Sequence, residues 1–371
     1  MSSGTPSPRT PIVVQVFGRT DVGRTREHNE DAFVIADLSA GRATLLPEVR
    51  THEVGEHGSL FMVADGMGGA AAGELASQMA TDVVLGEIQK NWLTAPPADS
   101  DTFAATLKAA AESANAHIHE YATKHPENRG MGSTATIAGL LGDTLYIAQI
   151  GDSRGYIVRD GIARQITKDQ SLVQRLVEAG EITPEEAEQS ERRNIILQAL
   201  GPDATVKIDL TYQQVKKGDV LVLCSDGLSG QVRTEDIGQI VAEEVDLVNV
   251  CKRLIDMANE AGGPDNITVV IARFDGDGLD AASSHEDIGH RVYQSHSMSR
   301  TTVPVPVVEE PDEDTEAAAM AITEETPIPA MDAIPAPVVT PRGPSVATLR
   351  LLFAFVGVAI AGYFVLRWMQ R

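Results

Sequence analysis

Four short apolar runs follow one another in the middle of the chain, and only small, turn-forming segments separate them. The runs cover residues 134–141, 144–150, 155–159 and 162–166, with Gly and Asp in every connection. Runs of this length are typical of strands, and tight Gly/Asp connections are typical of hairpins. The pattern therefore predicts an antiparallel meander. Further apolar runs predict strands at residues 59–64, 219–225 and 267–274.

Helices interrupt these strands. One apolar stripe with three- and four-residue steps consists of Phe103, Leu107, Ala110, Ala114, Ile118 and Tyr121, and an earlier one of Leu75, Met79, Val83 and Val84. Residues 183–186 read Thr-Pro-Glu-Glu, a capping box with proline at the first helical position, and predict a short helix. We therefore expect an α+β fold of two antiparallel sheets sandwiched between helices.

Composition divides the chain into four parts. Residues 1–11 are rich in Ser and Pro and are predicted to be disordered, whereas residues 12–274 have the regular hydrophobic pattern of a folded domain. Residues 275–347 are acidic and proline-rich with few large apolar side chains, which predicts a disordered linker. A transmembrane helix is predicted at residues 348–369.

The predicted anchor rests on residues 351–366, which carry no charge. At about 1.5 Å per residue this segment spans about 24 Å, slightly less than a hydrocarbon core of about 30 Å. Arg350 and Arg367 can extend it by snorkelling, and Trp368 suits the interface. A buried or surface-lying helix is the alternative. Because the polar N-terminus has no apolar export signal, we expect the folded domain to be cytoplasmic.

Charge and motif content exclude several classes of function. The net charge of −23 argues against non-specific nucleic-acid binding, which needs a basic surface. The histidines and the two cysteines show no zinc-binding spacing, and no Gly-x-Ser-x-Gly or Walker motif is present. Cys224 ends an apolar run and is expected to be a buried free thiol, with a disulfide to Cys251 as the less favoured alternative.

Acidic residues are placed next to predicted strands and beside small residues. They are Glu30, Asp31, Asp65, Asp152, Asp226 and Asp265. An Asp followed by Gly is by itself usually a turn. Here, however, apolar runs lead into Asp65 and Asp226, so a rigid sheet can aim both carboxylates inward. Gathered acids repel one another unless a cation lies between them, and Mg²⁺ or Mn²⁺ prefers such oxygen ligands. Two such ions can activate water for attack at phosphorus.

Six motifs carry a resemblance to a known family. They are RxxxED at residues 26–31, ADGMGG at 64–69, GMGST at 130–134, IGDSR at 150–154, CSDGLS at 224–229 and GGPDNITVV at 262–270. In this order, across residues 12–274, they closely resemble the bacterial branch of the protein phosphatase 2C family, the metal-dependent PPM phosphatases. The family fold, a pair of antiparallel sheets between helices, agrees with the elements predicted above.

The resemblance implies two Mn²⁺ or Mg²⁺ ions. Asp65 would bridge them, Asp226 and Asp265 would complete the protein ligands of one ion, and Glu30 with the carbonyl of Gly66 those of the other. No phospho-enzyme is expected, because the nucleophile would be a bridging water or hydroxide.

The resemblance also implies roles beyond direct ligation. Asp31 would hold metal-bound water, and Arg26 would grip the substrate phosphate through two oxygens. Two positions depart from the family pattern. Met67 stands where some members have a histidine proposed as general acid. Gly230 stands where many bacterial members have an aspartate for a third ion, so Asp152 lacks that partner and a third ion is doubtful. Residues 167–200 would form a flap beside the site.

The expected function is hydrolysis of phosphoserine and phosphothreonine on proteins, in opposition to membrane-associated serine/threonine kinases. The expected partners are phosphorylated proteins, such a kinase and the membrane, without nucleic acid. Two alternatives stay open. One is a catalytically silent scaffold on the same fold, and the other is a hydrolase of a small phosphorylated metabolite.

Overall fold

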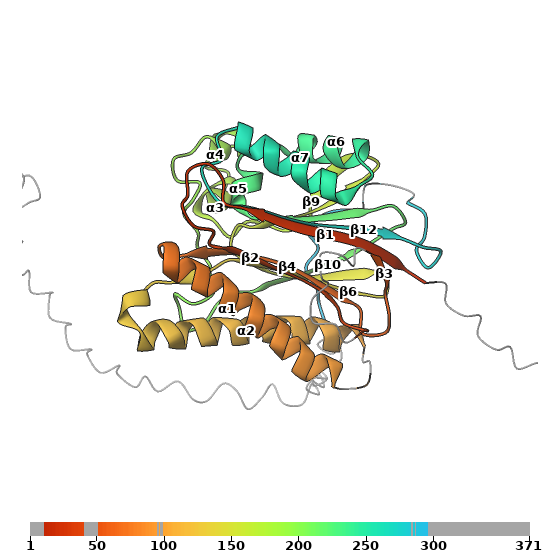
Figure 1. Ribbon diagram of the computed structural model, residues 1–371, viewed down its shortest axis with the longest axis horizontal. Helices are drawn as coiled ribbons and strands as arrows, with labels where there is room; N and C mark the ends of the chain where they lie inside the picture. Colours follow the sequence, from red (N-terminus) through yellow and green to blue (C-terminus); the bar gives the residue numbers. More distant parts are fainter. Residues whose placement is uncertain are drawn as a thin grey trace, which may run out of the picture. The chain divides into compact units, whose positions relative to one another are not determined.

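The computed structural model describes residues 11–40, 51–94, 96, 99–282, 285 and 287–295. Two antiparallel sheets face each other (Figure 1). The first has the strand order β3 (Thr51–Glu53), β1 (Val13–Asp21), β12 (Ile267–Asp275), β11 (Val220–Cys224), β8 (Arg154–Arg159), β9 (Ile162–Gln165). The second has the order β10 (Asp209–Gln214), β7 (Thr144–Ile150), β6 (Ala135–Leu141), β4 (Ser59–Met67), β2 (Asp31–Asp37), with β5 (Gly132–Ser133) paired to β4.

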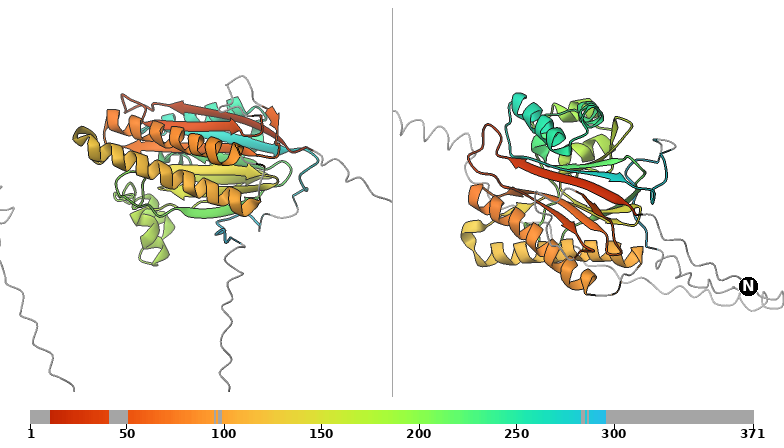
Figure 2. Two further views of the ribbon diagram at one scale, coloured as in Figure 1. Left: turned by 90° about the horizontal axis from the view of Figure 1, so that it is seen from below. Right: turned by 45° about the vertical axis from the view of Figure 1, so that its right-hand side comes forward.

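Helices cover the outer face of each sheet. The long helices α1 (Ala70–Ile88) and α2 (Ser100–Lys124) pack on the second sheet, and α6 (Thr234–Glu243) and α7 (Leu247–Glu260) on the first (Figures 1 and 2). Shorter helices are α3 (Leu172–Glu178), α4 (Pro184–Glu188) and α5 (Asp226–Ser229). The predicted arrangement of two sheets between helices is confirmed. Apolar side chains fill the space between the sheets and each sheet–helix interface.

The buried face of α1 differs in part from the predicted stripe. Val84 is fully buried, but Leu75 and Met79 are only partly buried, and the innermost positions are Ala76 and Ala80. A helix needs small side chains where its backbone approaches a sheet closely, because a large side chain would hold the two elements apart. A prediction based on the large apolar side chains therefore places the buried face of α1 next to its observed position.

The predicted four-strand meander is wrong in its middle. Strands β6 and β7 form one hairpin and β8 and β9 another, but the two hairpins belong to different sheets. The connection at residues 151–153 crosses between the sheets. Gly151 has a φ of 95°, and the Gln149 carboxamide donates to the carbonyl of Ser153 at 2.7 Å. The crossing carries Asp152 into the space between the two sheets' ends.

The folded domain also continues past the predicted boundary at residue 274. We call the described residues from 276 to 295 the strap. Leu279 and Ile288 of the strap are each only 6% exposed and lie in the core between the sheets. Val292 forms an antiparallel bridge with Thr211 of β10, so the strap extends the second sheet. These apolar anchors are isolated in a polar stretch, which explains why composition placed the segment in a linker.

Side-chain contacts hold the strap in place. The Tyr293 ring packs edge-on against Tyr146 and Tyr212, with ring centroids 5.2 and 6.0 Å away. Asp287 joins the ion pair in which buried Arg159 contacts Asp219 through two hydrogen bonds of 2.7 Å. A two-pronged guanidinium–carboxylate pair of this kind is among the stronger polar contacts in proteins.

Three predicted parts fall outside the described residues in whole or in large part. They are most of the N-terminal segment 1–11, the linker beyond residue 295 and the transmembrane helix at 348–369. Within the part of the chain that the structure describes, no helix combines the length and hydrophobicity needed to cross a bilayer.

We predict that Ile288→Ala lowers the free energy of unfolding by about 2–5 kcal/mol, because it leaves a cavity between the sheets. Val292→Ala is the matched control, since that side chain is 56% exposed and its loss should cost about 0.5 kcal/mol or less. Urea denaturation measures both. Equal stability of Ile288→Ala and wild type would show that the strap is not part of the folding unit.

Candidate metal centre

Six acidic residues that the sequence singles out lie at one end of the two sheets, where β2 and β12 begin and β4 leads into α1 (Figure 1). They are Glu30 and Asp31 at the start of β2, Asp65 near the end of β4, Asp152 in the crossing from β7 to β8, Asp226 at the start of α5, and Asp265 just before β12. Asp31 and Asp65 stand directly opposite each other in the β2–β4 pair. Segments far apart in sequence therefore bring their carboxylates to one place.

Burial and mutual repulsion disfavour the charged form of five of these acids, and two of the five show both causes clearly. The pKa of Asp65 is raised well above its usual range by burial and by the charges of Asp31 and Asp226. The pKa of Asp226 is raised by burial and by the charge of Asp265, although a hydrogen bond from Asp65 opposes the rise. A raised carboxyl pKa means that the charged form lacks compensation. A bound cation would supply it.

Asp31 and Glu30 lie on either side of the start of β2. Burial raises the pKa of Asp31 to about 7. Its Oδ2 accepts a 2.7 Å hydrogen bond from Ser225, whereas its buried Oδ1 makes no hydrogen bond to any described residue. The pKa of Glu30 is also raised, first by burial. Its carboxylate occupies the space that a side chain at Gly73 of α1 would fill, because a Cβ there would lie 2.6 Å from Oε2.

Asp152 lies close enough to other acids for their charges to affect its pKa. Its pKa is raised to about 8 by burial and then by the charges of Asp226 and Asp169. Its Oδ1 is buried and makes no hydrogen bond within the described chain. Gly230, where the resemblance leads us to expect an aspartate in many bacterial members, follows α5, and its N–H donates to the carbonyl of Asp226 at 2.7 Å. Asp152 is therefore in place without that carboxylate beside it.

Arg26 supplies positive charge at the rim. Its guanidinium donates a 2.8 Å hydrogen bond to Oδ2 of Asp265, and its side chain is 47% exposed. The charges of Glu30 and Asp65 also act on it. Gly66, the predicted carbonyl ligand, is held by its N–H, which donates to the carbonyl of Glu30 at 3.1 Å. The eight predicted site residues thus form one connected neighbourhood.

The donor set fits hard divalent cations, although the side chains are not arranged around one. Among the residues that the structure describes, no three His, Cys, Asp or Glu side chains are positioned to hold a metal ion directly. The acids nevertheless offer oxygen donors, two of them buried without a hydrogen-bond partner in the described chain, on Asp31 and Asp152. Oxygen ligands of this kind suit Mg²⁺ and Mn²⁺.

Several residues that support the acids were missed by sequence reasoning. Thr134 Oγ1 accepts from the backbone N–H of Asp65 at 3.0 Å, and the Thr134 N–H donates back to the Asp65 carbonyl at 2.8 Å. Ser225 and Asn266 hold other acid-bearing loops. All three belong to motifs already quoted, so a signal existed. Short polar side chains inside a motif of acids are candidates for this supporting role.

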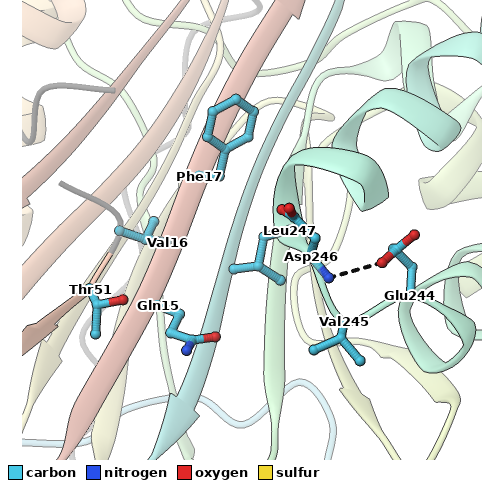
Figure 3. Close-up of a pocket in the computed structure, with 8 residues that line it drawn as sticks. All are labelled: Gln15, Val16, Phe17, Thr51, Glu244, Val245, Asp246 and Leu247. Carbon is cyan, nitrogen blue, oxygen red and sulfur yellow. Dashed lines mark hydrogen bonds between the residues drawn. The ribbon is translucent and has the colours of Figure 1, made fainter. Parts of the chain in front are cut away.

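A hollow of about 430 Å³ lies elsewhere, between β1 and the connection from α6 to α7 (Figure 3). Its lining residues are Gln15, Val16, Phe17, Thr51, Glu244, Val245, Asp246 and Leu247. None of the predicted site residues is among them. The candidate metal centre is therefore identified by its charges and contacts, and not by this hollow.

We predict that Mn²⁺ at about one hundred times its dissociation constant raises the melting temperature of the full chain by about 5–10 °C. Asp65→Asn should lose most of this shift. Because it removes a repelling charge, its metal-free form should be no less stable than the metal-free wild type. Differential scanning calorimetry measures both, with Asp82→Asn on the exposed face of α1 as control. An unchanged Mn²⁺ shift in Asp65→Asn would exclude Asp65 as a ligand.

Comparisons with known proteins agree on one family. The family model described as "Protein phosphatase 2C" matches residues 49–269. The chain is 38% identical over 264 residues to the serine/threonine protein phosphatase PstP of Mycobacterium tuberculosis, a match that covers 71% of this chain and 46% of that relative. It is 34% identical over 257 residues to the serine/threonine phosphatase stp of Listeria monocytogenes, covering 69% of this chain and 94% of the relative.

Solved structures of similar chains include one with bound metal ions. The catalytic domain of PstP in complex with two manganese ions has a TM-score of 0.57 and 36% identity, with 71% of this chain and 99% of that chain covered. The chain belongs to the metal-dependent protein phosphatase 2C family.

Proposed function

We propose that the chain is a protein phosphatase that hydrolyses phosphoserine and phosphothreonine with the help of two divalent cations, Mn²⁺ or Mg²⁺. The observation that carries the proposal is the set of buried, mutually repelling carboxylates on Asp31, Asp65, Asp152 and Asp226. Such a set is unfavourable for a merely structural protein and suits a cation site. Relatives named serine/threonine phosphatases support the choice of substrate.

The proposed ligands are Glu30, Asp65, Asp226 and Asp265, with the carbonyl of Gly66. Divalent cations, when bound there, supply the positive charge that activates water and stabilises a phosphoryl group. Asp31 is proposed to orient water beside the ions, because its Oδ1 is free of hydrogen bonds to described residues while Ser225 fixes its Oδ2. These assignments are consistent with one another, because all of the assigned residues lie together at one end of the two sheets.

Arg26 is proposed to bind the substrate phosphate. Its side chain is half-exposed, and its contact with Asp265 keeps the guanidinium next to a proposed ligand. A planar guanidinium can pair with two phosphate oxygens at once. Met67 has no proton to give, so the proton for the leaving serine or threonine oxygen must come from another group.

We predict that the full chain releases phosphate from a phosphothreonine peptide in Mn²⁺ and loses this activity in EDTA. Asp226→Asn, which keeps the size of the side chain but removes a charged ligand, should lower kcat/KM by about 100-fold or more. Phosphate release measures the effect, and Asp82→Asn should match the wild type. A folded wild type without Mn²⁺-dependent activity would favour a silent scaffold, and activity confined to small phosphorylated metabolites would change the substrate class.

Membrane attachment is a second part of the proposal. The uncharged segment at residues 351–366, flanked by Arg350 and Arg367, supports a single-pass C-terminal anchor. The phosphatase domain is proposed to lie on the cytoplasmic side of the membrane. An anchor would confine the domain near the bilayer and raise its effective concentration on substrates there. Membrane-associated serine/threonine kinases are the proposed opposing enzymes, because their products lie within the same reach.

We predict that deletion of residues 347–371 moves the protein from the membrane pellet to the supernatant after ultracentrifugation, without loss of phosphatase activity. The reason is that this deletion removes the apolar segment that would hold the protein in the hydrocarbon core of the membrane. Deletion of residues 304–345 is the control, and that protein should stay in the pellet. Sedimentation of the 347–371 deletion with membranes would rule out the anchor.

A further inference from the structure

One buried carboxamide joins two of the loops that carry the proposed ligands. Asn266 is 3% exposed, and its Oδ1 accepts a 2.8 Å hydrogen bond from the backbone N–H of Glu30. Its Nδ2 donates to the carbonyls of Val22 and His28, each at 2.9 Å. The Asn266 side chain therefore contacts the β1–β2 loop at three points, near its beginning, near its end and at the proposed ligand itself.

The same residue also fixes the neighbouring ligand. The backbone N–H of Asn266 donates to Oδ1 of Asp265 at 2.9 Å. The other carboxylate oxygen of Asp265 accepts from Arg26, which lies between Val22 and His28 in the clasped loop. Asn266 thus fixes both the Glu30 backbone and the Asp265 side chain. It also holds the loop that contains Arg26 at two points, on either side of Arg26.

A third acid-bearing loop meets the first two at this point. A Cβ on Gly227 would lie 1.9 Å from the backbone oxygen of Asn266, so only glycine allows the loop of Asp226 to approach so closely. Ser225, next to Asp226, accepts from the N–H of Thr268 at 3.0 Å and donates to Asp31. Asn266 lies where the three loops come together.

Electrostatics explains why such a clasp is needed. Glu30 and Asp265 carry like charges on neighbouring loops, so the two loops repel each other when no cation lies between them. Neutral hydrogen bonds from one carboxamide hold the loops together without adding charge. Because the side chain of Asn266 holds the Glu30 backbone and its backbone N–H holds Asp265, the clasp also fixes the separation of the two acids.

We propose that Asn266 is a positioning residue that sets the spacing of Glu30 and Asp265 for a divalent cation and aims Arg26 at the substrate phosphate. The inference rests on the proposed function, because it assumes that these acids are ligands. A role limited to stability would leave cation affinity unchanged in any variant that folds. A positioning role lowers it, as outer partners of metal ligands do by about 10–100-fold.

The test is Asn266→Ala in the full chain, with folding checked by circular dichroism. We expect the dissociation constant for Mn²⁺, measured by the electron paramagnetic resonance signal of free Mn²⁺, to rise about 10-fold or more. Phosphatase activity should recover in part at high Mn²⁺, while KM for a phosphothreonine peptide stays raised because Arg26 is less well placed. Wild-type Mn²⁺ affinity in folded Asn266→Ala would overturn the proposal.

Asn259→Ala is the matched control. Asn259 is also a buried asparagine, and it contacts the end of β1 by donating to Oδ1 of Asp21 at 3.2 Å, but it contacts no proposed ligand. Its Mn²⁺ affinity should stay within about two-fold of wild type. An equal loss in both variants would contradict a specific role for Asn266. Asn266→Ser, a smaller polar change, replaces the alanine variant if that one does not fold, with the same readouts.

The proposed function fails in a different way. If the wild type neither binds Mn²⁺ nor releases phosphate in its presence, the metal centre itself is refuted. If the wild type does both and Asn266→Ala and Asn266→Ser do so equally well, only the clasp is refuted.

Discussion

Repulsion among buried carboxylates is the constraint around which this end of the molecule is built. Burial alone raises the pKa of an acid, and the neighbouring charges raise it further for Asp65, Asp152 and Asp226. A protein keeps such groups together only with a rigid frame and a compensating partner. The antiparallel β2–β4 pair supplies the frame by placing Asp31 opposite Asp65. Divalent cations are the compensating partner that the oxygen donors suit.

Backbone crossings and close approaches deliver the remaining acids. The chain leaves one sheet at Ile150 and enters the other at Arg154, which brings Asp152 between the two. Glycine at position 227 lets the Asp226 and Asp265 loops touch, and Asn266 ties the β1–β2 loop to them. Each device is local, yet together they bring acids from five separate segments to one end of the sandwich. The site is therefore a property of the loops as much as of the sheets.

The strap shows how far the folded domain reaches. Ile288 fills space between the sheets, and Val292 pairs with β10. An edge strand that is covered in this way is protected from pairing with other chains.

The sequence by itself determined the class of fold, most strands of the two sheets, the capping box at Thr183 and the identity of the acids, because strand period, turn chemistry and motif spacing are local properties. It did not reveal that the two hairpins at residues 135–165 lie in different sheets, since hairpins look alike whichever sheet receives them. It also missed the strap. The large side chains that anchor the strap, Leu279, Ile288 and Tyr293, are not spaced with the period of a helix or a strand. In the sequence, Asn266 is distinguished only as one residue of the GGPDNITVV motif. Its role as a clasp depends on contacts with residues more than two hundred positions away, and only tertiary structure decides those.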